Sequence, residues 1–218
     1  MKQRLLNLWR ENRVFLIFVL LMLVFRSAVA DWNHIPSGSM YPGIIEGDRI
    51  GVNKLAYDLQ LPFTGISLYQ RDNPARGEVV VFRHPQTGTR LVKRVIGVPG
   101  DSLAMQNNQL ILNGEPLAYT AVAQHASSQD WMEQLPGAPH AIRTQQTSSL
   151  LNSFPAITVP DGHYIMLGDN RDNSADSRVF GPVPRDAIIG RATHVVMSLD
   201  PERFYLPRGD RFWQGIDS

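Results

Sequence analysis

The longest unbroken apolar stretch of the chain lies close to its N-terminus. Residues 14–25 (VFLIFVLLMLVF) contain no polar side chain, and the thirteen residues before them carry four basic side chains and one acid. As a helix, this stretch would span only about 18 Å, which is short of a hydrocarbon core about 30 Å thick. A helix extended to Leu8 and Ala30 is long enough, with Arg13 and Arg26 reaching opposite interfaces. The pattern predicts an N-terminal transmembrane helix.

The same segment also has the layout of a cleavable signal peptide. A basic start, an apolar run and the A-x-A sequence at 28–30 are typical of one, and cleavage after Ala30 would release a soluble protein. Arg26, however, stands where a cleavable segment usually has small neutral residues. We therefore interpret residues 1–30 as a cytoplasmic tail followed by an uncleaved anchor. The excess of basic residues before the apolar run then places the N-terminus in the cytoplasm and residues 31–218 on the other side.

Beyond residue 31, apolar residues occur in short β-type runs separated by turns. The runs are 48–54, 77–82, 90–98, 109–112, 162–167 and 192–199. The turn at 85–88 predicts that the second and third runs form a hairpin, and Asn113-Gly114 is a strong hairpin signal after the fourth. No long helical periodicity follows residue 31. The fold class is therefore mainly β: a transmembrane helix followed by a domain of packed antiparallel sheets or a barrel.

One long segment does not fit this pattern. Residues 116–159 are rich in Gln, Ser, Thr, Ala and His and show weak periodicity, so their strands cannot be placed. A segment of this length without clear elements is uncommon inside a compact domain. We expect it to be an insertion in a single β-rich domain that covers residues 31–218.

Composition and charge exclude several classes of protein. The chain has 218 residues, a formal net charge of +1 and no cysteine. No basic stripe is present, so we expect no nucleic-acid partner. The absence of cysteine excludes disulfides, thiolate nucleophiles and Cys-ligated zinc. The six histidines are scattered, and none has the i, i+4 spacing of a metal-binding helix, so we expect no metal and no cofactor. The oligomeric state stays open.

Two separate segments contain the residue types of a nucleophile and its base. Ser39 lies in the sequence IPSGSMYP, and Lys93 lies in the apolar run LVKRVI. A serine hydroxyl needs a base beside it, and a lysine can be that base only if burial lowers its pKa, by up to roughly 3–5 units. Ser–Lys pairs are an established variant of the catalytic triad. In a strand, Leu91, Lys93 and Val95 share one face and Arg94 points to the other, so aliphatic neighbours would desolvate Lys93.

Each of these residues also has an ordinary structural interpretation. A Ser-Gly-Ser sequence is common in turns, and a Lys-Arg pair in a strand is usually solvated. Lys54 is a competing base, although its sequence neighbours are more polar than those of Lys93. Ser37 and Ser39 are alternate residues, and in an extended segment they would point the same way. One hydroxyl can then attack a carbonyl carbon while the other donates to the developing oxyanion.

A third block, GDNRDNSADSR at 168–178, is dense in charge. It is not a calcium loop, because counting from Asp172 the sixth residue is Ser177 instead of Gly and the twelfth is Val183 instead of Glu. Acids that alternate with arginines instead predict an ion-pair network that makes the loop rigid.

Taken together and in this order, the three blocks resemble the type I signal peptidases, the membrane-bound serine peptidases that remove secretory signal peptides. The resemblance extends over residues 1–200. It departs from the pattern common in Gram-negative members at Gly43, where a threonine is frequent, and in having one predicted membrane segment instead of two. The resemblance implies roles for six residues: Ser39 as nucleophile, Lys93 as general base, Ser37 as oxyanion donor beside the Ser39 N–H, Ser174 as hydrogen-bond partner of the lysine, and Asp176 and Arg178 as a supporting salt bridge.

The resemblance also implies a partner, a location and a substrate surface. The partners would be preproteins with A-x-A cleavage sites and membrane lipid. The enzyme would lie in the inner membrane with its catalytic domain facing the periplasm or extracytoplasmic side, and the single predicted membrane segment would make it a single-pass protein. Strand geometry adds that substrate residues one and three before the cut meet the same surface. The residues expected to form that surface are Ile35, Pro36, Met40, Leu91 and Val92.

Two other functions remain open from the sequence. The same chemistry would serve a maturation peptidase dedicated to one pilus or conjugation protein. A membrane-tethered β-domain without catalytic activity, acting in assembly, is the alternative from another class.

Overall fold

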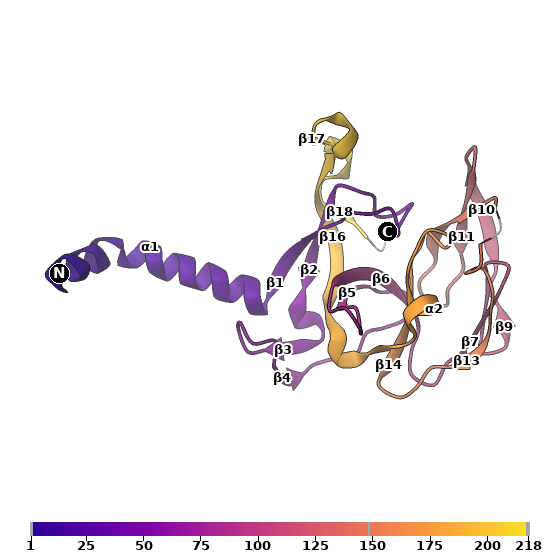
Figure 1. Ribbon diagram of the computed structural model, residues 1–218, viewed down its shortest axis with the longest axis horizontal. Helices are drawn as coiled ribbons and strands as arrows, with labels where there is room; N and C mark the ends of the chain where they lie inside the picture. The colour runs from indigo at the N-terminus through magenta and orange to yellow at the C-terminus, as the bar shows by residue number, and fades with distance from the viewer. Residues whose placement is uncertain (1, 148, 217–218) are drawn as a thin grey trace.

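The computed structural model describes residues 2–147 and 149–216, and a long N-terminal helix projects from a β-rich body (Figure 1). Helix α1 covers Lys2–Ala28, where the apolar run predicted a helix. Among the described residues, however, no helix is both long enough and apolar enough to cross a membrane. The transmembrane part of the prediction is thus not found in the structure, and Met1 lies outside the described residues.

The body is organised around an antiparallel sheet that curls on itself (Figure 1). The strand order is β1-β2-β16-β5-β6-β14-β15, and the short strands β17 and β18 pair with β16. Strand β16 is 13 residues long and joins the two halves of the sheet. The bounds are β1 Ala30–His34, β2 Asp48–Asn53, β5 Val79–Arg83, β6 Arg90–Gly97, β14 His163–Leu167, β15 Val183–Pro184, β16 Ile188–Asp200, β17 Leu206–Pro207 and β18 Gln214–Gly215.

The mainly β prediction is confirmed, and most predicted runs are strands. Strands β5 and β6 form the expected hairpin, with Val80 opposite Lys93. The Asn113-Gly114 turn joins β8 to β9, and both residues have positive φ (53° and 88°), as a tight hairpin turn requires. After residue 31, the α-helix in the described chain is the single turn α2, Ser177–Phe180.

Three smaller sheets complete the fold. The strands β10, β11 and β12 form one, β13, β7, β8 and β9 form another, and β3 pairs with β4. In the described part of the chain, four short 3₁₀ turns lie between strands. The bounds are β3 Asp58–Gln60, β4 Ser67–Gln70, β7 Ser102–Gln106, β8 Gln109–Leu112, β9 Glu115–Pro116, β10 Tyr119–Gln124, β11 Ser128–Glu133, β12 His140–Gln145, β13 Phe154–Thr158, η1 Lys54–Ala56, η2 Arg185–Ala187, η3 Pro201–Arg203 and η4 Gly209–Arg211.

The segment 116–159, whose strands the sequence could not place, contains β10 to β13. It also contributes to a hydrophobic core. Leu117, Leu135, Ile142 and Val159 are buried together with residues of β7 and β8. Whether the segment is an insertion stays a prediction, but it packs as part of the body and is not a peripheral loop.

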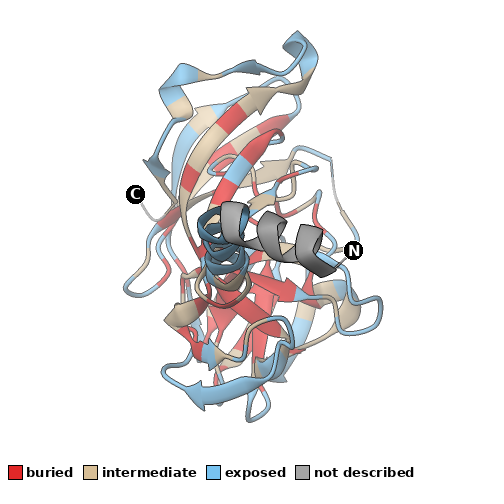
Figure 2. Ribbon diagram, turned by 90° about the vertical axis from the view of Figure 1, so that its left-hand side faces the viewer, coloured by how far each residue is buried: buried red, intermediate tan, exposed pale blue. Residues whose placement is uncertain are grey.

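Buried residues concentrate in the strands of the body, whereas the described part of α1 and the region around β17 are exposed (Figure 2). Strand β5 is covered on both faces: Val79 and Val81 pack in one cluster, and Val80 and Phe82 in another. Side chains alternate along a strand, so β5 lies between two hydrophobic layers. Its neighbour β6 is consequently buried from Lys93 to Gly97.

Candidate active site

Ser39 lies in a compact turn between β1 and β2. The Tyr41 N–H donates to the Gly38 carbonyl at 3.1 Å, and the Ile44 N–H donates to the Met40 carbonyl at 3.1 Å. The expectation that Ser37 and Ser39 lie in an extended segment is therefore wrong, because local hydrogen bonds close the chain into a turn. The turn is fixed to the body through Met40, whose side chain is buried in the core.

Lys93 approaches the serine from strand β6. Its Nζ donates to Ser39 Oγ at 2.6 Å, a contact between residues 54 positions apart in the chain. Lys93 is only 3% exposed. Burial lowers the pKa of Lys93 to about 8, although the charges of Asp176 and Asp169 oppose the shift. The lysine therefore combines hydrogen-bond distance to a hydroxyl with a pKa that gives a neutral amine in mildly alkaline solution.

Lys54, the competing base, has a different function. Its Nζ donates to the carbonyl oxygens of Arg26 and Ser27 at 3.0 Å each. These carbonyls belong to the C-terminal end of α1, where a helix leaves acceptors free and favours positive charge. Lys54 Nζ also lies 3.6 Å from Asp31 Oδ2. Its ammonium therefore caps α1.

The predicted salt bridge of the 168–178 block is present and buried. Arg178 Nε and Nη2 donate to the two carboxylate oxygens of Asp176 at 2.8 and 2.7 Å. The Gly168 N–H donates to Asp176 Oδ2 at 3.0 Å. Burial raises the pKa of Asp176, but the Arg178 guanidinium and the Gly168 N–H outweigh it and hold this pKa below its usual range. Asp176 stays ionised and fixes the loop.

Ser174 is buried beside this loop but does not make the expected contact. In the described chain, no hydrogen bond joins its hydroxyl to Lys93 Nζ, which is paired with Ser39. The Ser174 side chain instead packs against Gly168. A Cβ at position 168 would collide with Ser174 Oγ and with the Ser39 carbonyl oxygen. Only glycine allows the loop to lie this close to the serine turn.

Asn170, which was not among the predicted site residues, links the loop to the serine turn. Its backbone N–H donates to the Ser39 carbonyl at 3.1 Å, and its Nδ2 donates to the Gly38 carbonyl at 2.9 Å. Two consecutive carbonyls of the turn are therefore held by one residue. Its place in the 168–178 block was the available signal, but spacing alone does not show which member of the block faces the serine.

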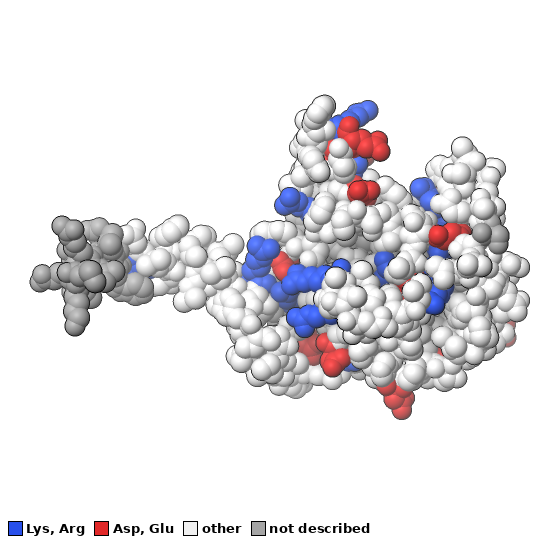
Figure 3. All heavy atoms as spheres, in the orientation of Figure 1, with Lys and Arg blue, Asp and Glu red and all other residues white. Residues whose placement is uncertain are grey.

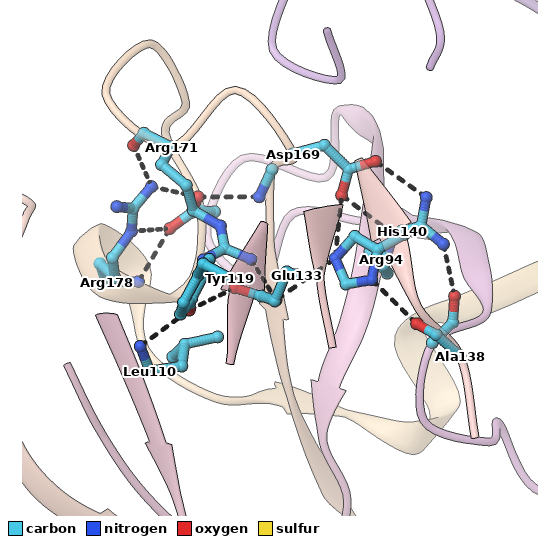
Figure 4. A network of polar contacts seen from close by, with 12 residues as sticks. Arg94, Leu110, Tyr119, Glu133, Ala138, His140, Asp169, Arg171 and Arg178 are labelled. Carbon is cyan, nitrogen blue, oxygen red and sulfur yellow. Dashed lines mark hydrogen bonds and ion pairs between the residues drawn. The ribbon is translucent and has the colours of Figure 1, made fainter. Parts of the chain in front are cut away.

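Two further ion pairs of the same loop are fully buried (Figure 4). Arg94 Nε and Nη2 donate to the carboxylate of Asp169 at 3.0 and 2.9 Å. Arg94 was expected on the face of the strand opposite Lys93. Both are buried, because β6 is covered on both sides and Asp169 neutralises the guanidinium. Arg171 Nη1 and Nη2 donate to Glu133 at 2.7 and 2.6 Å.

Glu133 belongs to the 116–159 segment, which thereby supports the loop. The Tyr119 hydroxyl donates to Glu133 Oε2 at 2.7 Å. Burial raises the pKa of Glu133, but the Arg171 charge and the His140 imidazole outweigh it and hold this pKa well below its usual range. Strand β12 also contacts the loop directly: the Arg143 N–H donates to the Asp169 carbonyl at 2.8 Å. No sequence motif indicated these contacts.

A cavity of about 100 Å³ lies beside the Ser39–Lys93 pair. Ser37, whose side chain is exposed, also lines it. Larger hollows of about 460 and 450 Å³ lie elsewhere and contain neither Ser39 nor Lys93. Within the described residues, no group of three acidic or histidine side chains is arranged to hold a metal ion. The five residues expected to form the substrate surface all line the small cavity: Ile35, Pro36, Met40, Leu91 and Val92.

Comparison with known proteins identifies relatives that cover most of the chain. The family model described as "Signal peptidase, peptidase S26" matches residues 8–197. A signal peptidase I of Pseudomonas aeruginosa is 37% identical over 217 residues, covering 92% of this chain and 76% of that protein. A probable signal peptidase I-2 of Synechocystis is 31% identical, covering 85% of this chain and 72% of that protein. A crystal structure of a signal peptidase I from Enterococcus faecalis V583 is 28% identical and covers 55% of this chain and 97% of that one, with a TM-score of 0.36.

Proposed function

We propose that this chain, which belongs to the signal peptidase family, peptidase S26, and is thus a serine peptidase, cleaves signal peptides from preproteins. In this proposal Ser39 is the nucleophile and Lys93 is the general base. The observation that carries this proposal is the 2.6 Å contact between Lys93 Nζ and Ser39 Oγ. Two conditions for a Ser–Lys pair are met at once: hydrogen-bond reach and a pKa lowered by burial.

In the proposed reaction, neutral Lys93 takes the proton of the Ser39 hydroxyl while Oγ attacks the carbonyl carbon of the scissile bond. The protonated lysine then gives its proton to the departing amine, which leaves an ester on Ser39. In the second half, Lys93 takes a proton from a water molecule that attacks this ester. The signal peptide is released with a free carboxylate, and Ser39 regains its hydroxyl hydrogen from the lysine.

The oxyanion of the tetrahedral intermediate needs donors placed before the reaction begins. We assign this role to the Ser39 N–H and the Ser37 hydroxyl. In the described chain no backbone hydrogen bond uses the Ser39 N–H. Ser37 lines the same cavity as Ser39. Asp176 and Arg178 support the loop and take no part in bond making.

The proposed substrates are preproteins with small residues one and three positions before the cut. An extended peptide presents alternate side chains to one surface. The cavity beside Ser39 is small, at about 100 Å³, and Ile35, Met40 and Val92 give it apolar walls. A surface of this kind accepts alanine and excludes large side chains, which gives A-x-A selectivity.

We place the enzyme in the inner membrane as a single-pass protein, with residues 1–30 as tail and anchor and residues 31–218 as the periplasmic catalytic domain. The apolar side chains of α1 support this. Val14, Phe15 and Leu21, for example, are 75%, 63% and 62% exposed on a helix that projects from the body (Figure 1). Such a surface is unfavourable in water and favourable in lipid. Anchoring would bring Ser39 close to the membrane surface, where a preprotein presents its cleavage site.

The test is cleavage of a model preprotein by the full chain in detergent. Ser39→Ala and Lys93→Ala should each abolish turnover with the fold intact by circular dichroism. The double variant should be no worse than either single one, because residues that act as a unit give non-additive losses. Lys54→Ala is the matched control and should stay active. Substantial activity of Lys93→Ala would overturn the assignment of the base.

A preprotein series defines the substrate range. Ala, Val, Leu and Phe are placed in turn one and three positions before the cut, and cleavage rates are compared. Efficient cleavage with Leu or Phe directly before the cut would contradict the small-residue surface. Cleavage of preproteins with unrelated mature parts separates a general signal peptidase from one dedicated to a single substrate.

A further inference from the structure

Arg90 lines the same cavity as Ser39 and Lys93. It is the first residue of β6, three positions before Lys93, which corresponds to about 10 Å along an extended strand. Its Nη1 donates to Asn33 Oδ1 at 3.2 Å. Both residues line the cavity. Arg90 and Asn33 therefore form one end of this cavity, and Lys93 and Ser39 form the other. We call the cavity the groove from here on.

Positive charge exceeds negative charge around Arg90. Asp31 is the acid paired with Arg90 in the described chain, at 3.3 Å, and the same carboxylate is 2.9 Å from Arg26 and 3.6 Å from Lys54. Three cations thus share one anion. The Arg90 side chain is 48% exposed, and Arg90 lines the cavity. Lys and Arg gather where the helix meets the body (Figure 3).

The direction of the groove follows from the chain itself. Helix α1 ends at Ala28, and β1 begins two residues later at Ala30. The Arg90 end of the groove is therefore the end nearer to the helix. If the proposed function holds and α1 lies in the membrane, a preprotein enters from this end. Its residues before the cut then pass Arg90, and the residue whose carbonyl is attacked lies beside Ser39.

We propose that Arg90 is a specificity residue that binds an acidic side chain about four positions before the cut. The three-residue spacing of Arg90 and Lys93 on β6 sets that position for an extended peptide lying along the strand. The surplus of cations selects an anion over a neutral polar group, because each charge adds to the attraction. This inference rests on the proposed function, since it concerns the substrate of the same site.

The experiment uses the full chain in neutral detergent and three preproteins that differ only at the fourth residue before the cut: Glu, Gln or Lys. For exposed charges of this kind, we expect kcat/KM for Glu to exceed that for Lys by about three- to tenfold at low salt. The difference should lie mainly in KM. It should shrink in 1 M salt, where the screening length falls to about 3 Å.

Variants separate this role from a structural one. Arg90→Glu should reverse the preference to Lys, and Arg90→Lys should keep the preference for Glu. Arg83→Gln is the matched control: Arg83 lies directly opposite Arg90 on β5, is exposed, and has its guanidinium beside Gly65, away from the groove. It should leave the order of the three substrates unchanged.

The outcomes distinguish this inference from the function it rests on. Equal cleavage of all three preproteins, unchanged in Arg90→Glu, would overturn the specificity role and leave the peptidase activity standing. A charge preference at residues after the cut would overturn the direction of the groove. A loss in Arg90→Glu that is equal for all substrates and appears only with anionic lipid vesicles would assign the cations to lipid headgroups instead. No cleavage by the wild-type protein would remove the proposed function itself.

Discussion

Replacing Lys93 with methionine should stabilise the folded protein while destroying its activity. The pKa of Lys93 falls from 10.5 to about 8 because the ammonium is buried. A difference of one in pKa corresponds to about 1.4 kcal/mol, so holding the charged form in the folded state costs about 3 kcal/mol. Methionine has a similar length and no charge. Near pH 7, the free energy of unfolding of Lys93→Met should therefore exceed that of the wild type by up to about 3 kcal/mol.

The pH dependence of this difference isolates the ionisation. Between pH 8 and pH 10.5, the unfolded chain binds more protons at Lys93 than the folded chain does. Stability of the wild type must then rise with pH across this window, and methionine does not titrate. The gap between the two proteins should be largest below pH 8 and nearly gone at pH 10.5. Packing differences between lysine and methionine are independent of pH and do not change this trend.

Two measurements check the reasoning. Denaturant unfolding of both full-length proteins in the same detergent, from pH 7 to pH 10.5, gives the stability difference. The rate of preprotein cleavage by the wild type should rise with pH through an apparent pKa near 8. A stability difference that stays constant over the whole range, or a cleavage rate that peaks near pH 5, would refute a buried neutral lysine as the base.

Three other substitutions test the surroundings of the pair. Ser37→Ala should lower kcat by an amount corresponding to about 2.7–4 kcal/mol if its hydroxyl donates to the oxyanion, and wild-type turnover would leave Ser37 as part of the turn only. Asn170→Ala removes a bond worth about 1 kcal/mol to the serine turn, so kcat should fall several-fold with little change in KM, and an effect on KM alone would contradict a positioning role. Glu133→Gln leaves Arg171 as a buried, uncompensated charge and should cost about 3–5 kcal/mol in denaturant unfolding. The exposed Glu202→Gln is its control, and equal effects of the two would show that the buried pair contributes nothing.

Local sequence pattern was sufficient to predict many of the secondary-structure elements and the candidate site residues of this protein. The apolar run at 14–25 predicted a helix, and the short β-type runs predicted the strands, because side-chain periodicity is a property of the segment itself. The Asn113-Gly114 turn was predictable for the same reason. Ser39 and Lys93 were candidates because their chemistry and immediate neighbours are visible in the sequence. The composition of residues 168–178 was sufficient to predict an ion-pair loop.

Only the tertiary structure decided which residues contact each other and how their pKa values shift. Lys54 and Lys93 are both lysines in or next to strands, but one binds the end of a helix and the other lies 2.6 Å from a serine hydroxyl. Arg171 pairs with Glu133, which is 38 residues away in a segment without any motif. A pKa depends on burial and on neighbouring charges, and both are set by segments distant in the chain. The sequence therefore determined many of the elements and the candidate chemistry, whereas packing determined which lysine lies beside the serine, the direction in which its pKa shifts and the contacts that hold the serine turn in place.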